Sequence, residues 1–253
     1  MFFKLGGNMF LPRGEGEACG MFSLPHIISL VIILIIIGIA LYKCKNLEEN
    51  NVIKITKIFA IILTILEIIK ITYNLYYGYN NLDNYFPLSF CSLFIYSLYL
   101  YSYGSNIFKK LGQNFIVGGA VFAGLAFLVF PTTSLTMHPI YHYLSIYSMI
   151  YHGAMVYIGL LIYINNLYKF NIKNYIIYIS YCIFFMAIAI ILNTIYNSNL
   201  MFLSMPFNIP IKMFDYLYNI NNVIYTISII IVYLVVPYLL MFLTHKVVKK
   251  CSE

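Results

Sequence analysis

Seven apolar stretches, each long enough to cross a membrane as a helix, dominate this chain of 253 residues. They cover approximately residues 25–42, 53–76, 86–103, 111–130, 139–164, 175–196 and 220–243. A hydrocarbon core of ~30 Å needs roughly 20 apolar residues in helical form. Within lipid, each backbone polar group must be bonded inside its own segment, which favours helices over open strands. The sequence therefore predicts an all-α membrane protein, a bundle of seven transmembrane helices.

The composition fits a membrane setting and argues against several other classes. Hydrophobic residues make up 62% of the chain and charged residues 9%, whereas soluble domains are about half apolar and about a quarter charged. The net charge of +7 does not indicate a nucleic-acid partner, because the basic residues stand singly or in pairs beside apolar stretches. We expect membrane lipids as partners. The five scattered cysteines form no CxxC pair, so we expect no disulfide framework, no metal site and no cofactor.

The lysines that flank the stretches predict an orientation. Eleven fall on one side of a seven-helix arrangement: Lys43, Lys45, Lys54, Lys57, Lys109, Lys110, Lys169, Lys173, Lys246, Lys249 and Lys250. The other side receives Lys4, Arg13 and Lys212. The positive-inside rule then places the C-terminus in the cytoplasm and the N-terminus outside. This orientation gives an extracytoplasmic arm at 1–24, a membrane domain at 25–246 and a cytoplasmic tail at 247–253.

Polar residues at membrane depth are costly, and their default interpretation is functional. Glu67 and Lys70 lie one helical turn apart in the second stretch, so we expect an ion pair that faces the bundle interior. Two roles remain open for the pair. The two charges neutralise each other and fix helix packing, or the pair transfers a proton or binds a substrate.

Histidines along the fifth stretch predict the lining of a cavity. His138, His142, Ser145 and His152 fall on one stripe at ~3.6 residues per turn. His138 and His142 have the i, i+4 spacing of metal ligands, but no carboxylate or third ligand lies nearby in the sequence. The alternative for each histidine is a buried side chain with satisfied hydrogen bonds.

Cys91 stands between two serines in the stretch FPLSFCSLFIY at 86–96. A cysteine becomes nucleophilic when its thiolate is stabilised, commonly by a neighbouring histidine. His152 approaches the same cavity from the same side and is the candidate base. The alternative is that Cys91 is a small hydrophobic residue, as buried cysteines often are.

Four motifs resemble those of the YwaF-like family of bacterial integral membrane proteins, which is similar to the eukaryotic transmembrane protein 164 family. They are FSLPHIISL at 22–30, FPLSFCSLFIY at 86–96, SMIYHGAMVYIGL at 148–160 and NSNLMFLSMP at 197–206. The resemblance implies seven membrane helices. Because the eukaryotic relatives are linked to acyl transfer among phospholipids, it also implies a membrane-embedded acyltransferase or hydrolase that acts on lipid acyl esters.

Carried over to this sequence, the resemblance implies catalytic roles for Cys91 and His152. It also places His26 and Asn199 among the substrate-binding residues, to which the histidine stripe adds His142. Ser89 stands where many members carry a histidine, so a mechanism with a second basic group beside Cys91 is in doubt. The alternative is a transporter or a small-molecule binding protein without catalysis, in which the stripe and the Glu67–Lys70 pair line a path.

Overall fold

The computed structural model describes residues 7–207 and 211–252, with side chains up to residue 247. Within these ranges the chain forms helices and connections and no β-strand. Lys4 and the side chains of Lys249 and Lys250, which entered the predicted charge distribution, lie outside the described part.

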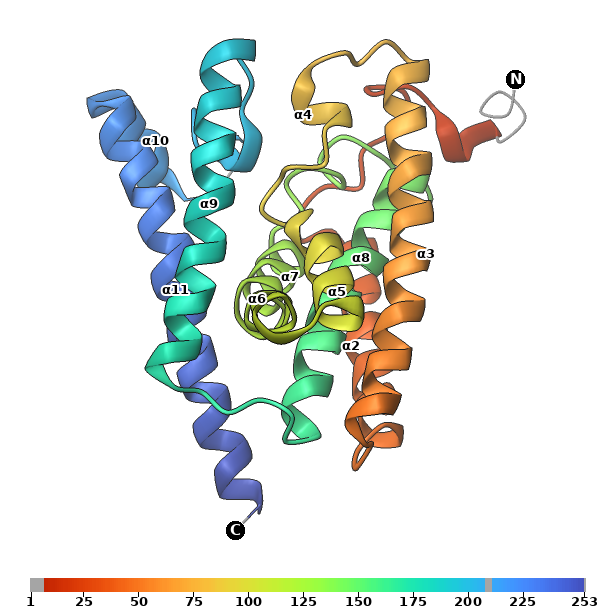
Figure 1. Cartoon of the computed structure of the whole chain (residues 1–253). Coiled ribbons are helices and arrows are strands. Elements are labelled where there is room, and N and C mark those ends of the chain that lie inside the picture. Colours follow the sequence, from red (N-terminus) through yellow and green to blue (C-terminus); the bar gives the residue numbers. More distant parts are fainter. Residues whose placement is uncertain (1–6, 208–210, 253) are drawn as a thin grey trace.

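The longer helices form a bundle (Figure 1). They are α2 (Leu24–Lys43), α3 (Glu49–Tyr76), α5 (Leu93–Tyr103), α6 (Asn106–Phe115), α7 (Val121–Val129), α8 (Tyr143–Ile164), α9 (Ile172–Tyr196) and α11 (Asn222–Ser252). A π-helical turn, η2 (Ile116–Ala120), joins α6 and α7 into one continuous helix. The short elements are η1 (Gly7–Phe10), α4 (Leu82–Tyr85), η3 (Leu200–Phe202) and α10 (Lys212–Ile220).

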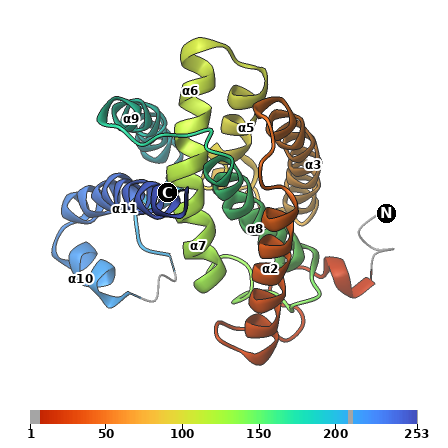
Figure 2. The ribbon, with the colours of Figure 1, turned by 90° about the horizontal axis from the view of Figure 1, so that it is seen from below.

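The continuous helix α6–η2–α7 crosses the centre of the molecule. Seen from below, it separates α9, α10 and α11 on one side from α2, α3, α5 and α8 on the other (Figure 2). Among the helices long and apolar enough to cross a membrane, this one and α8 are the most buried. In their apolar stretches 72% and 78% of the residues lie inside the protein, compared with 11% for α2 and 17% for α11. The outer helices instead expose isoleucines and other large apolar side chains. Such a surface suits lipid rather than water.

Five helices of the described chain are long and apolar enough to cross a membrane: 24–43, 106–129, 143–164, 172–196 and 222–247. This agrees with a multi-pass membrane protein. The other two predicted spans differ, because α5 has only 11 residues and α3 carries charged side chains along its 28 residues. The count of seven spans therefore stays a prediction.

Two predicted helix starts are wrong, and both lie beside a proline. The stretch 86–103 is helical only from Leu93, and the stretch 139–164 only from Tyr143. Pro87 and Pro139 follow residues that are disfavoured in helical conformation. Downstream of Pro87, the Ser89 hydroxyl also accepts a hydrogen bond from the Ser92 N–H at 3.0 Å, and this local bond competes with the helix.

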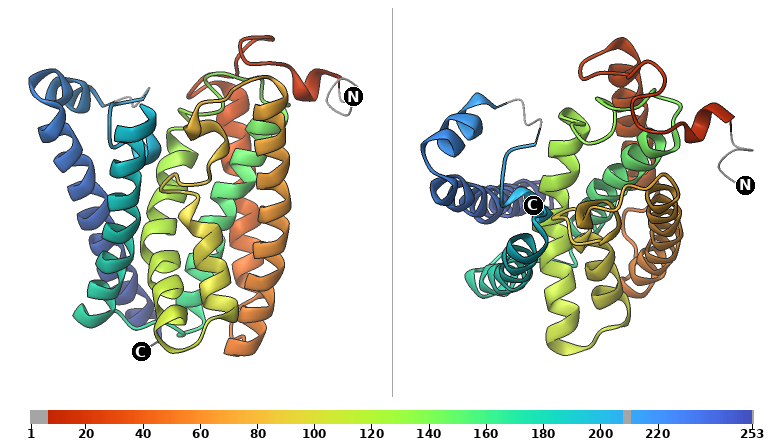
Figure 3. Two further views of the ribbon diagram at one scale, coloured as in Figure 1. Left: turned by 45° about the horizontal axis from the view of Figure 1, so that its top comes forward. Right: turned by 90° about the horizontal axis from the view of Figure 1, so that it is seen from above.

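The lysine-bearing connections gather at one end of the bundle. Figure 3 shows connections 44–48, 104–105 and 165–171 at the end where the C-terminus lies, while the N-terminal arm, connection 130–142 and α10 lie at the other. We call these the lysine-rich end and the lysine-poor end. The structure thus groups the basic residues as the sequence predicted; which end faces the cytoplasm is not tested.

Candidate functional site

Residues 86–92 run without helical structure between α4 and α5 inside the bundle (Figure 1). The Ser89 and Ser92 hydroxyls lie 2.7 Å apart and close a turn around Cys91. The Phe94 N–H donates to the Cys91 carbonyl at 3.0 Å. This N–H in the first turn of α5 is thus bonded within the segment. Irregular backbone at membrane depth is tolerated where protein covers it or where it lines a cavity. This segment therefore distinguishes the site of Cys91 from a plain helix.

Aromatic side chains tie the Cys91 segment to α8 and α11. The Tyr151 hydroxyl on α8 donates to the Cys91 carbonyl at 3.1 Å. Phe90 stacks on Tyr233 of α11 with ring centroids 4.0 Å apart. The Tyr233 hydroxyl donates in turn to the Met201 carbonyl at 3.0 Å. Tyr233 thus connects two of the sequence motifs, 86–96 and 197–206. No feature of the sequence singles out Tyr233, since it stands in the apolar run IVYLVV of α11.

His152 is held as a neutral imidazole with one free nitrogen. Its Nδ1–H donates to the Ser148 carbonyl at 2.7 Å, and its Nε2 is buried without a hydrogen-bonding partner in the described structure. The ring stacks on Phe127 of α7 at 3.7 Å. Gly124 permits this approach, because a Cβ there would lie 2.8 Å from the His152 carbonyl oxygen. A fixed Nδ1–H and a free Nε2 lone pair are what a general base needs.

The predicted Cys91–His152 pair is not hydrogen bonded in the described structure, since Nε2 has no partner. The link between the two residues is Tyr151, which precedes His152 and bonds to the Cys91 carbonyl. The pairing of thiol and imidazole therefore stays a prediction.

Both ring nitrogens of His26 form hydrogen bonds within the fold. Its Nδ1 accepts from the Phe22 N–H at 3.0 Å, so the proton sits on Nε2, which donates to the Leu128 carbonyl at 3.0 Å. These bonds join the start of α2 to the end of α7. A role for His26 in binding substrate stays a prediction.

His142 and His138 lie at the lysine-poor end and not on one helical stripe with His152. His142 is the N-cap of α8: its Nδ1 accepts from the Leu144 N–H at 3.1 Å, and its Nε2–H donates to the Leu11 carbonyl at 3.0 Å. His138 lies before the helix and stacks on His142 at 4.0 Å. The predicted stripe is wrong for His138 and His142, because both precede α8, which begins at Tyr143.

Burial keeps these two histidines uncharged. Desolvation, helped by nearby His142 and Arg13, lowers the pKa of His138 to about 3. Desolvation also lowers the pKa of His142, against the opposing effect of its bond to Leu11.

Asn199 shapes the connection after α9. Its side-chain oxygen accepts from the N–H groups of Ser204 and Met205 at 3.0 and 3.1 Å, and its amide donates to the Met205 carbonyl at 2.8 Å. Its backbone N–H donates to Asp83 at 2.8 Å. The side chain is thus engaged within its own loop, and its predicted contact with substrate stays untested.

The Glu67–Lys70 ion pair is confirmed, with Nζ and Oε1 2.6 Å apart. Glu67 is buried, and its other oxygen accepts a short hydrogen bond from the Tyr147 hydroxyl. Tyr143, Tyr147 and Tyr151 form a row on α8 whose hydroxyls reach α3 and the Cys91 segment. We did not predict this row, although the spacing of four residues was visible in the sequence.

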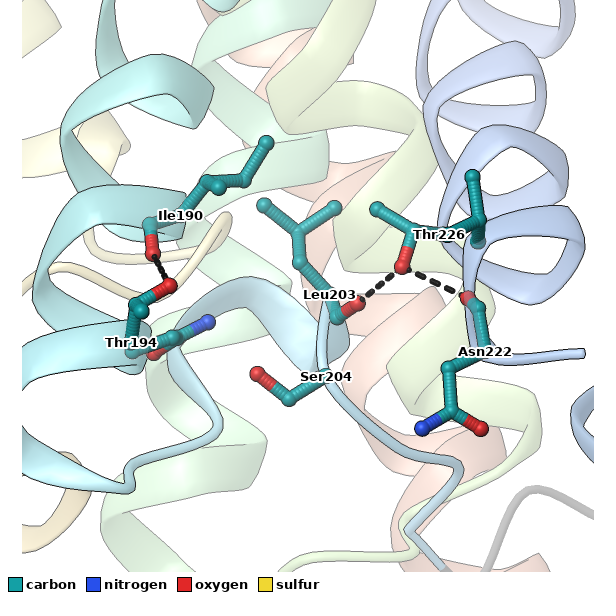
Figure 4. Close-up of a pocket in the computed structure, with 8 residues that line it drawn as sticks. Ile190, Thr194, Leu203, Ser204, Asn222 and Thr226 are labelled. Atoms are coloured by element: carbon teal, nitrogen blue, oxygen red, sulfur yellow. Dashed lines mark hydrogen bonds between the residues drawn. The ribbon is translucent and has the colours of Figure 1, made fainter.

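Two hollows in the described structure lie away from Cys91 and His152. A pocket of about 250 Å³ lies between α9 and α11, where Thr194, Ser204 and Asn222 contribute polar side chains (Figure 4). An apolar groove of about 500 Å³ lies between α5, α6 and α9 and is lined mainly by tyrosines and phenylalanines. Neither of these two hollows is lined by Cys91 or His152.

The buried central helices and the apolar outer surface define a multi-pass membrane protein. Residues 21–241 match the TMEM164 family, and the chain belongs to that family. Neither the curated proteins nor the solved structures give a match.

Proposed function

We propose that this TMEM164-family protein is a membrane-embedded acyltransferase or hydrolase of lipid acyl esters, with Cys91 as the nucleophile and His152 as the base. The observation that carries the proposal is the state of His152: Nδ1–H is fixed by the Ser148 carbonyl and Nε2 is buried without a partner. An oriented neutral imidazole is the usual activator of a thiol or hydroxyl nucleophile.

The reaction proceeds in two balanced steps. The Cys91 sulfur attacks the ester carbonyl, the thiol proton passes to His152 Nε2, and the C–O bond breaks as the leaving alkoxide takes that proton. The resulting thioester is then attacked by water or by a second alcohol, whose proton His152 accepts and returns to the departing thiolate. Water as acceptor gives a hydrolase, and an alcohol gives an acyltransferase.

Substrate binding has to bring the thiol to the imidazole. The irregular segment 86–92 supports this step, because no regular helix fixes it and the hydrogen bond that joins Cys91 to α8 in the described structure comes from the Tyr151 hydroxyl. Catalytic hydrogen bonds often form only in the substrate complex.

The test compares Cys91→Ser with Cys182→Ala in purified protein, using release or transfer of acyl chains from labelled phospholipids. Cys91→Ser is expected to lower turnover by at least about a thousandfold, whereas Cys182→Ala, a change at the buried cysteine of α9, keeps it. Full turnover in Cys91→Ser rules out the nucleophile.

A transporter or binding protein is the second candidate, favoured by the buried Glu67–Lys70 pair and the Tyr147 hydroxyl bonded to it. In that case Glu67→Gln abolishes uptake or binding, and Cys91→Ser leaves it intact.

We also propose seven spans, with the lysine-rich end in the cytoplasm of a bacterial cell. The grouping of Lys43, Lys57, Lys110 and Lys173 with the C-terminus supports this orientation, because positive residues near short connections are retained in the cytoplasm.

A further inference from the structure

Arg13 is the only arginine in a chain whose other fourteen basic residues are lysines. It lies in the N-terminal arm before α2, at the lysine-poor end (Figure 3). Lysine is a flexible point charge, whereas arginine presents five N–H donors in a rigid plane. The single use of arginine therefore indicates a position where the geometry of the donors matters as well as the charge.

Neutral groups hold the Arg13 guanidinium in place. Its Nη2 donates to the side-chain oxygens of Asn74 at 3.2 Å and Asn84 at 2.7 Å. Its central carbon lies 4.3 Å from the centre of the Tyr79 ring. Its backbone N–H donates to the Tyr79 hydroxyl at 2.7 Å. The orientation of the side chain is thus set by α3 and α4.

No carboxylate among the described residues forms an ion pair with Arg13, although Glu15 lies two residues further along the chain. The ion pairs of the described structure join Glu67 to Lys70 and Glu49 to Lys109. Burial lowers the pKa of the guanidinium, which shows that the surroundings of Arg13 solvate its charge less well than water does. A partly buried cation held only by neutral groups attracts an anion.

Some hydrogen-bonding atoms of Arg13 and of nearby His138 have no partner in the described structure. Its Nε–H is buried without an acceptor, and its Nη1 makes no hydrogen bond to a described residue. His138 is 1% exposed, and its Nδ1 also has no partner. Buried polar atoms are nearly always paired, so two orphans in one region point to a missing ligand.

The two orphans belong to one neighbourhood. His138 stacks on His142, whose Nε2–H donates to the Leu11 carbonyl, two residues before Arg13. The charge of Arg13 is also close enough to contribute to the lowered pKa of His138. Arg13 and His138 are thus linked through His142 and Leu11 at one end of the bundle.

We propose that Arg13 and His138 form a binding site for a phosphate group at the lysine-poor end of the bundle. Guanidinium N–H groups bind phosphate oxygens strongly, and the Nδ1–H tautomer of His138 supplies a further donor. Tyr73, Tyr77 and Tyr79 surround the site, and tyrosines mark the depth of lipid headgroups. The phosphate is either part of a lipid headgroup or a free anion. The site requires no catalysis at Cys91 and stands apart from the proposed function.

The test uses the wild-type protein, because an arginine-specific reagent such as phenylglyoxal modifies Arg13 alone. The full chain is purified in a phosphate-free maltoside detergent, and the labelling rate is measured with inorganic phosphate, a phosphodiester lipid or diacylglycerol. A ligand at about ten times its Kd is expected to slow labelling about tenfold. Chloride at matched ionic strength serves as the salt control.

The three arms separate the sources of the phosphate. Protection by inorganic phosphate alone identifies a site for the free anion, and protection by the phosphodiester lipid alone identifies a headgroup site. Protection by both identifies a site that accepts either form. No protection by either, or equal protection by diacylglycerol, overturns the proposal.

Two variants test whether the arrangement of the guanidinium donors matters. The ligand that protects Arg13 should raise the midpoint of thermal unfolding, and this rise is measured in each variant. Arg13→Lys keeps the charge but loses the oriented donors and is expected to lose most of the rise. Lys212→Gln removes one exposed charge at the same end and is expected to keep it. An undiminished rise in Arg13→Lys would overturn the role assigned to the guanidinium.

Discussion

His26 and His152 show how one residue type serves two purposes in this protein. His26 uses both ring nitrogens to join α2 to the end of α7, while His152 uses one and leaves the other free. Paired nitrogens stabilise the fold, and an unpaired buried nitrogen costs free energy unless a ligand or a reacting group meets it. The two residues should therefore respond differently to substitution.

His26→Leu is expected to destabilise the protein by about 1–3 kcal/mol, because the Phe22 N–H and the Leu128 carbonyl lose their partner. His152→Leu removes one hydrogen bond and an orphan nitrogen together, so its effect should be smaller. Thermal unfolding in detergent measures both. Equal losses of stability would contradict the distinction between a structural and an available histidine.

Glu67→Gln leaves Lys70 without its counter-charge. Removal of one partner from a buried pair costs about 3–5 kcal/mol, and less here because 26% of the Lys70 side chain is exposed. The double variant Glu67→Gln with Lys70→Met should recover much of the loss, since no charge is left unpaired. Folded yield on size-exclusion chromatography compares the two. A double variant no better than the single one would show that the charges do not compensate each other.

At the scale of elements, the interrupted segment between α4 and α5 is the feature that most distinguishes this bundle. Its turn rests on the Ser89 hydroxyl, which accepts from the Ser92 N–H and lies beside the Ser92 hydroxyl. The turn presents Cys91 between elements instead of burying it within a helix.

Ser89→Ala is expected to lower stability by about 1 kcal/mol, the usual cost of losing one hydrogen bond. It should also speed amide hydrogen exchange over residues 90–93. Ser105→Ala is the matched control, because Ser105 precedes α6 without a side-chain capping bond and is exposed. If the two variants exchange alike, the Ser89 hydroxyl does not hold the turn.

The connection before α8 makes the lysine-poor end sensitive to acid. His138 has a folded pKa of about 3 and an ordinary value of 6.5, so only the unfolded chain binds a proton between these values. Stability from this group is complete above pH 6.5 and falls as the pH drops below it, by at most about 1.4 kcal/mol per unit. The thermal midpoint should decrease from pH 7.5 to pH 5, and less so in His138→Phe, which keeps a ring to stack on His142. An identical decrease in both proteins would show that groups other than His138 cause the loss of stability in acid.

For the whole molecule, the arrangement of the two ends predicts the topology. A reporter fused after Glu253 should be active in the cytoplasm, and one inserted in the 203–207 turn should be active outside. These positions lie beyond the lysine-rich end and at the lysine-poor end, respectively. An external reporter at the C-terminus would mean that the number of spans is even or that the orientation is reversed.

The sequence by itself determined the helical membrane class, the separation of the lysines and the Glu67–Lys70 pair. These follow from local physics: helices satisfy their own backbone in lipid, positive charges stay at one side, and residues three apart share a helix face. Each of these properties is set within one segment or at its ends.

Only the tertiary structure decided which polar atoms are paired. Nothing in the sequence shows that His26 reaches Leu128, that Tyr147 reaches Glu67, or that Arg13 is held by Asn74 and Asn84. These partners lie between 61 and 102 residues apart along the chain. Hydrogen bonds depend on differences in distance of a few tenths of an ångström. Whether a buried side chain is structural or available for chemistry is therefore a property of the packed bundle.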